Sequence, residues 1–198
     1  EWRDALVLTL DYEVDPGENI TPPVKTEVLL GYFHNHLYIA FRAFDQKPEK
    51  IRARITDRDK IWDDDYVGIV LDPFNDSRLT YNFYCNPYGI QAEKVIGING
   101  GETPWDAIWN SAGRIGSAGY IVEMEIPFNT LRFQRKKEEQ AWGIDLIRSY
   151  PRDLSHLIGL VPRDRDNGCY MCQLDKIIGF VGAKPGENLE FDPTLAAV

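Results

Sequence analysis

Apolar and polar residues alternate in many short runs along the chain. Val67, Ile69 and Leu71 form one such series, and residues 122–126 form another. A period of two is typical of a β-strand that buries one face. No stretch of helical length carries a clear 3.6-residue period. The pattern therefore predicts an all-β protein.

Gly, Pro and Asn residues separate the apolar runs and limit the predicted strands. Residues 47–58 also alternate, which predicts an edge strand or an exposed connector. Residues 127–133 predict one helical turn, and the stretch with Trp105 and Trp109 looks irregular. Residues 5–10 form a short apolar run. The predicted strands are residues 26–33, 37–44, 66–72, 79–86, 90–98, 120–126, 142–149, 156–161 and one within 170–181. Many short strands between such turns predict an antiparallel β-sandwich, jelly-roll-like, with short helical turns.

The length of 198 residues suits a single domain. We assign residues 1–181 to the sandwich, and residues 182–198 to a C-terminal tail or a linker to a missing downstream region, because the composition changes there. The chain has no initiator Met and no charged-then-apolar leader, so we expect an excised domain or a processed product. No run approaches the ~18 apolar residues of a membrane span, so we expect none in this segment.

The charge balance limits the classes of partner. With 22 basic and 31 acidic residues, the net charge is −9. A nucleic-acid partner would need a basic face, so we expect none. A neutral or cationic ligand, or a bound divalent metal, fits the charge.

An anionic segment with five carboxylates, Asp57, Asp59, Asp63, Asp64 and Asp65, precedes the predicted strand 66–72. Such closely spaced carboxylates repel one another unless a cation, an arginine or water separates them. All but Asp63 are candidate ligands of Ca²⁺, which prefers oxygen, although the spacing is not that of an EF-hand. The alternative is a solvated loop with Arg58 and Arg78 as ion-pair partners and aspartates that cap turns.

The cysteines and the paired histidines are weaker signals of a metal site. Cys169 and Cys172 form a Cys-x-x-Cys pair, while Cys85 stands alone. Without a second pair or a histidine at zinc spacing, plain thiols, a disulfide and a metal site all stay open. His34 and His36 flank a predicted turn, where a polar hairpin tip explains them better than a metal does.

Residues throughout the chain match one family in order. They are Trp2 and Ala5, Thr26-Glu27-Val28, Leu37-Tyr38, Arg58-Asp59, Asp64-Asp65, Leu71-Asp72, Asp76 to Arg78, Tyr81-x-Phe83, Asn86-Pro87-x-Gly89-x-Gln91, Trp105-Asp106, Trp109, Glu123-x-x-Ile126-Pro127-Phe128, Leu131-Arg132-Phe133, Trp142-Gly143 and Arg148. Together they resemble the family 9 carbohydrate-binding module-like domain, in the version found at the N-terminus of bacterial outer-membrane-associated proteins of uncharacterised function. Two departures are Glu93, where the family has Asp, and residues 155–162, which lack an expected Trp.

The resemblance implies a β-sandwich that binds carbohydrate between aromatic rings, with structural calcium in some members. It also implies a location in the bacterial envelope, periplasmic, outer-membrane-associated or extracellular. An outer-membrane β-barrel region in the same chain is a further implied partner.

Three Trp lie in loop-like settings and are candidate sugar-binding residues: Trp62, Trp105 and Trp109. The apolar C–H face of a pyranose stacks on an indole, and polar neighbours then bind its hydroxyls. We assign the polar role to Asn86 and Gln91, and we favour Trp62 as the main platform because the anionic loop around it should be exposed. The alternative is that these indoles plug the ends of the core.

Two further functions stay open. Glu123 and Glu125 share one face of a predicted strand, two residues or roughly 6.6 Å apart. Paired carboxylates serve glycoside hydrolases, which cleave O-glycosyl bonds, although an ordinary outward strand face also explains them. The other function is that of a structural interaction domain. We expect the domain itself to be non-catalytic. Whether the parent protein is a glycoside hydrolase stays open at this point.

Overall fold

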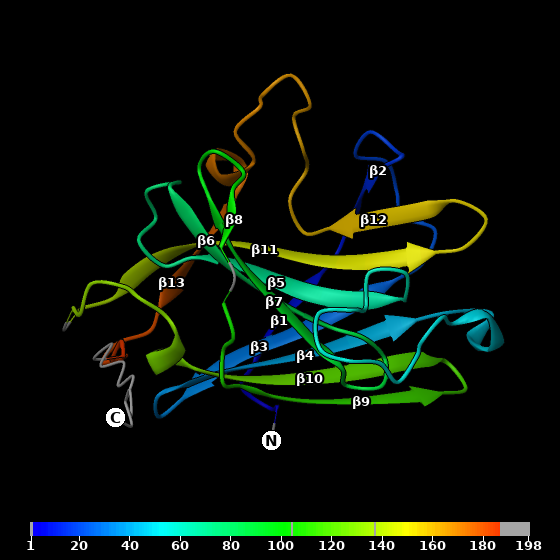
Figure 1. Cartoon of the computed structure of the whole chain (residues 1–198), viewed down its shortest axis with the longest axis horizontal. Coiled ribbons are helices and arrows are strands. Elements are labelled where there is room, and N and C mark those ends of the chain that lie inside the picture. Colours follow the sequence, from blue (N-terminus) through cyan, green and yellow to red (C-terminus); the bar gives the residue numbers. More distant parts are fainter. Residues whose placement is uncertain (1, 104, 137, 187–198) are drawn as a thin grey trace, which may run out of the picture.

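The computed structural model describes residues 2–103, 105–136 and 138–186, which form two antiparallel β-sheets packed face to face (Figure 1). The five-stranded sheet has the order β1 (Leu6–Thr9), β3 (Thr26–Phe33), β4 (His36–Phe44), β10 (Gly119–Pro127) and β9 (Asn110–Gly116). The eight-stranded sheet has the order β2 (Tyr12–Asp15), β12 (Ser155–Gly159), β11 (Gln140–Pro151), β5 (Tyr66–Asp72), β6 (Leu79–Cys85), β7 (Gln91–Gly97) and β8 (Glu102–Thr103), and β13 (Asp175–Gly179) also pairs with β11. The predicted antiparallel β-sandwich is confirmed.

The alternating residues form the core between the sheets. Val67, Ile69 and Leu71 of β5 are fully buried and pair with Cys85, Phe83 and Tyr81 of β6, respectively. On the other sheet, Val122, Met124 and Ile126 of β10 are also buried and face this core. Each large apolar side chain buried in this way contributes roughly 1.5–3 kcal/mol. The period of two in the sequence therefore reports the inner faces of both sheets.

Several elements differ from the prediction or sharpen it. Residues 47–58 are a connector that contains the short 3₁₀ helix η1 (Pro48–Lys50), and η2 (Phe128–Thr130) is the predicted helical turn. The strand predicted within residues 170–181 is β13, and the 3₁₀ helix η3 (Tyr170–Gln173) precedes it. The strands β2, β8 and β9 were not predicted. Strand β9 is rich in Gly, Ser and Asn, which have low strand propensity, and pairing with β10 overrides that preference.

The cysteine alternatives and the domain limit have structural outcomes. Cys169 and Cys172 are joined by a disulfide, and Cys85 is a buried free thiol whose pKa is raised to about 12 by burial. The assigned limit at residue 181 stays a prediction, but Ala183 is still buried in the core. Most of the proposed tail, residues 187–198, lies outside the described residues.

Candidate functional site

The anionic segment, residues 57–65, packs against the outer face of the eight-stranded sheet. Its anchor is Ile61, which is fully buried in a second apolar cluster with Tyr84 of β6, Ala92 of β7 and Ile147 of β11. This cluster lies on the opposite side of the sheet from the main core. Because Ile61 is fixed there, the neighbouring Trp62 is held at the surface of the sheet.

Trp62 is held by aromatic edges and still exposed. Its ring lies edge-on to Tyr66 at 5.6 Å and to Tyr84 at 5.2 Å between centroids, yet 39% of the residue is exposed. The ammonium of Lys94 lies 4.4 Å from the centroid of the indole and also pairs with Glu102 at 2.7 Å. Burial raises the pKa of Tyr84, so its hydroxyl stays neutral beside Trp62. Held in this way, the indole is preorganised for stacking.

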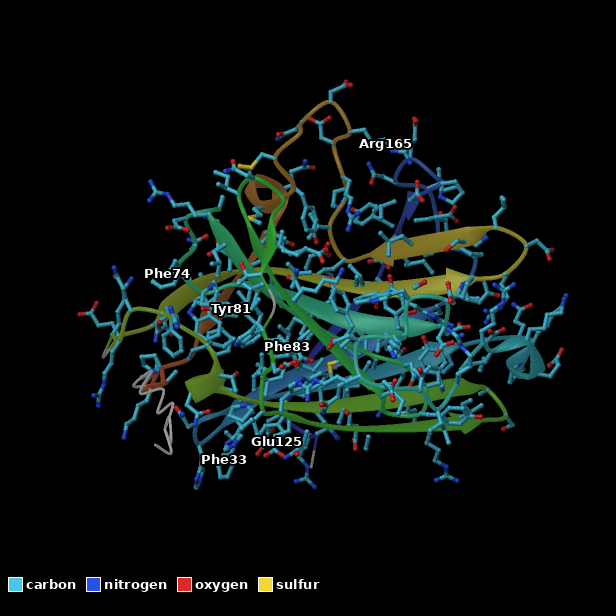
Figure 2. The ribbon with its side chains drawn as sticks, viewed as in Figure 1. Phe33, Phe74, Tyr81, Phe83, Glu125 and Arg165 are labelled. Carbon is cyan, nitrogen blue, oxygen red and sulfur yellow. A yellow bond between two sulfur atoms is a disulfide. The ribbon has the colours of Figure 1, made fainter. Side chains whose placement is uncertain are left out.

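Trp105 faces the same hollow from the other side of β7. It is half-buried and contacts the rings of Tyr81 and Phe83, which are labelled in Figure 2, at 5.2 and 5.5 Å between centroids. Together with Trp62 it lines a cavity of about 470 Å³, which we call the Trp62–Trp105 pocket. The residues that line this pocket are Asp59, Trp62, Glu93, Lys94, Glu102, Thr103, Trp105 and Asp106.

A buried carboxylate fixes both sides of the pocket. Glu93 Oε2 accepts hydrogen bonds from Arg58 Nε at 3.0 Å and from Trp109 Nε1 at 3.3 Å. Its Oε1 accepts from the backbone N–H of Ala107 at 2.9 Å and from Arg58 Nη2. The backbone N–H of Glu93 donates to Asp59 Oδ1 at 3.1 Å. Glu93 thus ties the anionic segment and the segment that carries Trp105 to one point on β7.

Three of the predicted sugar-binding residues do not line this pocket. Trp109 is 4% exposed and lies edge-on to Phe83 in the core, as in the alternative of an indole that plugs the sandwich. Asn86 is fully buried, and its Oδ1 accepts the backbone N–H groups of Tyr88 and Ile90, which closes a turn. Gln91 Nε2 donates to the backbone oxygen of Trp109 at 2.9 Å. In this structure all three hold loops beside the pocket.

The four predicted calcium ligands lie apart and have other partners. Asp64 accepts from Arg54 Nε at 2.8 Å and from Asn86, and Asp65 accepts from Arg152 at 2.8 and 3.1 Å. Asp57 pairs with Lys60 at 2.7 Å, which lowers the pKa of that carboxyl, and Asp59 binds the backbone of Glu93. Across residues 2–103, 105–136 and 138–186, no group of three or more His, Cys, Asp or Glu side chains is arranged to hold a metal ion. The calcium site stays a prediction.

Glu123 and Glu125 point outward from β10 on the five-stranded sheet. Both line a second and larger hollow, described further below. Glu125 accepts hydrogen bonds from Asn110 Nδ2 and the Tyr38 hydroxyl, each at 3.0 Å, and these bonds lower the pKa of its carboxyl. The proton donor of a glycosidase needs a raised pKa, so Glu125 does not suit that role.

Sequence reasoning missed Glu93, Lys94, Glu102, Thr103 and Asp106 as pocket residues, and it assigned Asp59 to a metal site. The signal that could have found Glu102 and Thr103 is the turn at residues 99–101, which joins β7 to β8 and sets Glu102 opposite Ile96.

Among the described residues, no helix has the length and apolar character needed to span a membrane.

Comparisons with known proteins agree with this architecture. The family model described as carbohydrate family 9 binding domain-like matches residues 1–150. A search of curated proteins gave no match. A crystal structure of a proposed carbohydrate-binding protein from Bacteroides uniformis ATCC 8492 has the same fold, with a TM-score of 0.71 and 13% identity over 88% of this chain and 86% of that one. The chain therefore belongs to the carbohydrate family 9 binding domain-like family, a class of carbohydrate-binding domain.

Proposed function

We propose that this domain binds a saccharide in the Trp62–Trp105 pocket and does no chemistry on it. The observation that carries the proposal is the meeting of two indoles, from segments far apart in the sequence, around one cavity of about 470 Å³. That volume falls within the ~300–1,000 Å³ of small-ligand sites. The pocket suits one or two sugar rings.

The lining supplies both kinds of contact that a sugar needs. A pyranose presents an apolar C–H face to the exposed indole of Trp62, while the carboxylates of Asp59, Glu102 and Asp106 accept hydrogen bonds from its hydroxyls. Lys94 supplies donors. Because these carboxylates outnumber the one ammonium, the pocket favours an uncharged sugar over an acidic one.

The resemblance of the sequence to N-terminal domains of bacterial outer-membrane-associated proteins supports a proposal about the setting of this binding. We place the domain in a protein of the bacterial envelope, where it holds a saccharide beside a downstream outer-membrane β-barrel. Calcium would bind only if aspartates of the anionic segment exchanged their present partners for the ion. Elemental analysis of the domain before and after chelation tests whether calcium is bound. A domain that contains no metal, and whose thermal stability does not change on chelation, would contradict calcium binding.

The direct test is the Trp62→Ala variant, titrated by calorimetry against a panel of neutral mono- and disaccharides. Loss of the stacking platform should weaken binding by about tenfold or more, which corresponds to ~1.4 kcal/mol. The matched control is Ile108→Ala, because Ile108 is 86% exposed, close to Trp105 in sequence, and outside the pocket. Unchanged affinity in Trp62→Ala, with the fold intact by circular dichroism, would contradict the proposal.

A further inference from the structure

A second hollow lies on the outer face of the five-stranded sheet. It has a volume of about 1010 Å³ and is lined by residues of β3, β4, β10 and β9, by residues of the N-terminal segment up to Leu6, and by residues 177–180, which include the end of β13. We call it the β4–β10 groove. Glu125, at this groove, and Phe33 lie along the lower side of the view in Figure 2, below Tyr81 and Phe83. Trp62, in contrast, packs on Tyr66 and Tyr84 of the eight-stranded sheet. A ligand bound in one hollow would therefore leave the other open.

A missing side chain helps to form the hollow. Gly31 on β3 lines it, and a Cβ placed at Gly31 would meet no atom within 4 Å. Its neighbours on the sheet pair normally, since Gly31 lies opposite Tyr38 of β4. The groove is therefore open space above Gly31, and a larger residue at 31 would occupy that part of it without displacing the backbone.

Aromatic rings border the groove. Trp2 lies before β1, yet its Nε1 donates to Glu123 Oε1 of β10 at 3.2 Å. Because β3 and β4 lie between β1 and β10, the N-terminal residues cross the outer face of the sheet. Tyr38 of β4 is half-buried and donates its hydroxyl to Glu125. An indole and a phenol thus lie beside polar groups, which is the combination that stacks and orients a sugar ring.

The charge of the lining restricts the ligand. Asp4, Glu123 and Glu125 contribute three carboxylates, and none of the described residues that line the groove is Lys or Arg. The amide of Asn110 keeps Glu125 in its hydrogen-bonded, ionised form. Three like charges repel a uronic acid, accept hydrogen bonds from hydroxyls, and attract a protonated amine.

We propose that the β4–β10 groove is a second saccharide-binding site that takes a linear oligosaccharide without carboxylates, with amine-bearing sugars bound most tightly. The inference rests on the proposed function, because it extends saccharide binding from one sheet to the other. The groove has about twice the volume of the Trp62–Trp105 pocket, so it suits several rings. The two sites together would hold one polysaccharide at two points, or two chains at once.

Calorimetric titration with three hexamers tests the inference: glucosamine hexamer, xylohexaose and galacturonic acid hexamer. The probe variant is Gly31→Leu, which places a bulky side chain in the groove, and the matched control is Gly168→Leu, where an added Cβ also meets nothing within 4 Å. We expect Gly31→Leu to weaken the glucosamine hexamer by about tenfold or more and the control to leave it unchanged. In the Trp62→Ala background the glucosamine hexamer should still bind, and galacturonic acid hexamer should not bind to the groove.

The outcomes separate the two sites. If Trp62→Ala removes all binding and Gly31→Leu changes nothing, the groove is no site and the proposed function stands. If Gly31→Leu removes hexamer binding, and Trp62→Ala changes the affinity neither for the hexamers nor for the neutral mono- and disaccharides, the groove stands and the Trp62–Trp105 pocket falls. If none of the hexamers binds to the intact domain, the groove proposal is overturned as well. An intact domain that sediments as a dimer, with a monomeric Gly31→Leu variant, would make the groove a self-interface and overturn the proposal.

A second variant covers the case in which Gly31→Leu does not fold. Glu123→Gln removes one charge, keeps the volume, and retains an acceptor for Trp2 Nε1. It should weaken the glucosamine hexamer about threefold or more while xylohexaose is unaffected, because only the amine responds to the charge. Equal loss for both hexamers, or no loss for either, would overturn the preference for amines.

Discussion

The two outer faces of this sandwich carry hollows that are built in different ways. The β4–β10 groove is lined largely by strand residues of β3, β4, β9 and β10, with space left by Gly31 and with the N-terminal segment and residues 177–180 at its sides. The Trp62–Trp105 pocket is made by two loop segments that meet at Glu93, a side chain with no exposed surface. The first kind of site depends on local register, and the second depends on contacts between residues far apart in the chain. Substitutions should therefore damage the two hollows unequally.

The largest expected effect follows from removing the carboxylate that joins the two loop segments. Glu93→Ala leaves Arg58, the N–H of Ala107 and Trp109 Nε1 without their acceptor. A buried donor left without its acceptor costs about 1–3 kcal/mol. The variant leaves two such donors, beside the 36% exposed Arg58, so we expect the free energy of unfolding, measured in urea, to fall by about 2–6 kcal/mol. Saccharide binding by the Trp62–Trp105 pocket should be lost, while the groove keeps its ligand.

The control for this variant is Glu102→Ala, which removes an exposed partner of Lys94 from the rim of the same pocket. It should cost less than ~1 kcal/mol, as exposed ion pairs do. Equal losses from the two variants would mean that Glu93 does not organise the pocket.

A matched pair of asparagines gives the next largest effect. Asn86 is fully buried beside the pocket, and Asn110 lies exposed at the groove. Asn86→Ala leaves two backbone N–H groups unpaired and should destabilise the domain by about 1–3 kcal/mol, while Asn110→Ala should stay within ~0.5 kcal/mol. Chemical denaturation of both variants measures the difference. If Asn110→Ala were the more damaging change, the contrast between loop-built and strand-built sites would be wrong.

The same contrast explains what the sequence could predict. Strands such as β3 and β5 begin and end at the predicted residues, because alternation records which face of a strand is buried. Trp62 could be singled out, since its polar neighbours marked a surface segment. The burial of Trp109 could not, because it depends on Phe83 and Glu93, which meet it only in the folded chain. The same holds for Asp64 and Asp65, whose arginine partners are Arg54 and Arg152 and not the expected Arg58 and Arg78.

A smaller effect is expected from the cation above the indole. Lys94→Met keeps the apolar stem and removes the ammonium that lies 4.4 Å from the Trp62 ring. An exposed cation–π contact contributes about 0.5–1 kcal/mol, so thermal stability should fall slightly. If Lys94 donates to the sugar, the affinity for neutral saccharides should also fall in calorimetry, while glucosamine hexamer binding to the groove stays the same. Unchanged affinity would remove Lys94 from the ligand-binding set.

The smallest effect concerns pH at the groove. Hydrogen bonds from Asn110 and Tyr38 lower the pKa of Glu125 below its unfolded-state value of ~4.3. A lowered acid pKa contributes stability that is present above the unfolded-state value and is lost as the pH falls through the folded-state value. Glu125→Gln should therefore flatten the acid limb of a stability–pH curve slightly and leave stability near neutral pH unaffected apart from a constant offset. The Asn110→Ala variant should flatten the same limb, because it removes the first cause of the shift, whereas a steeper limb in either variant would show that Glu125 is not stabilised as the anion.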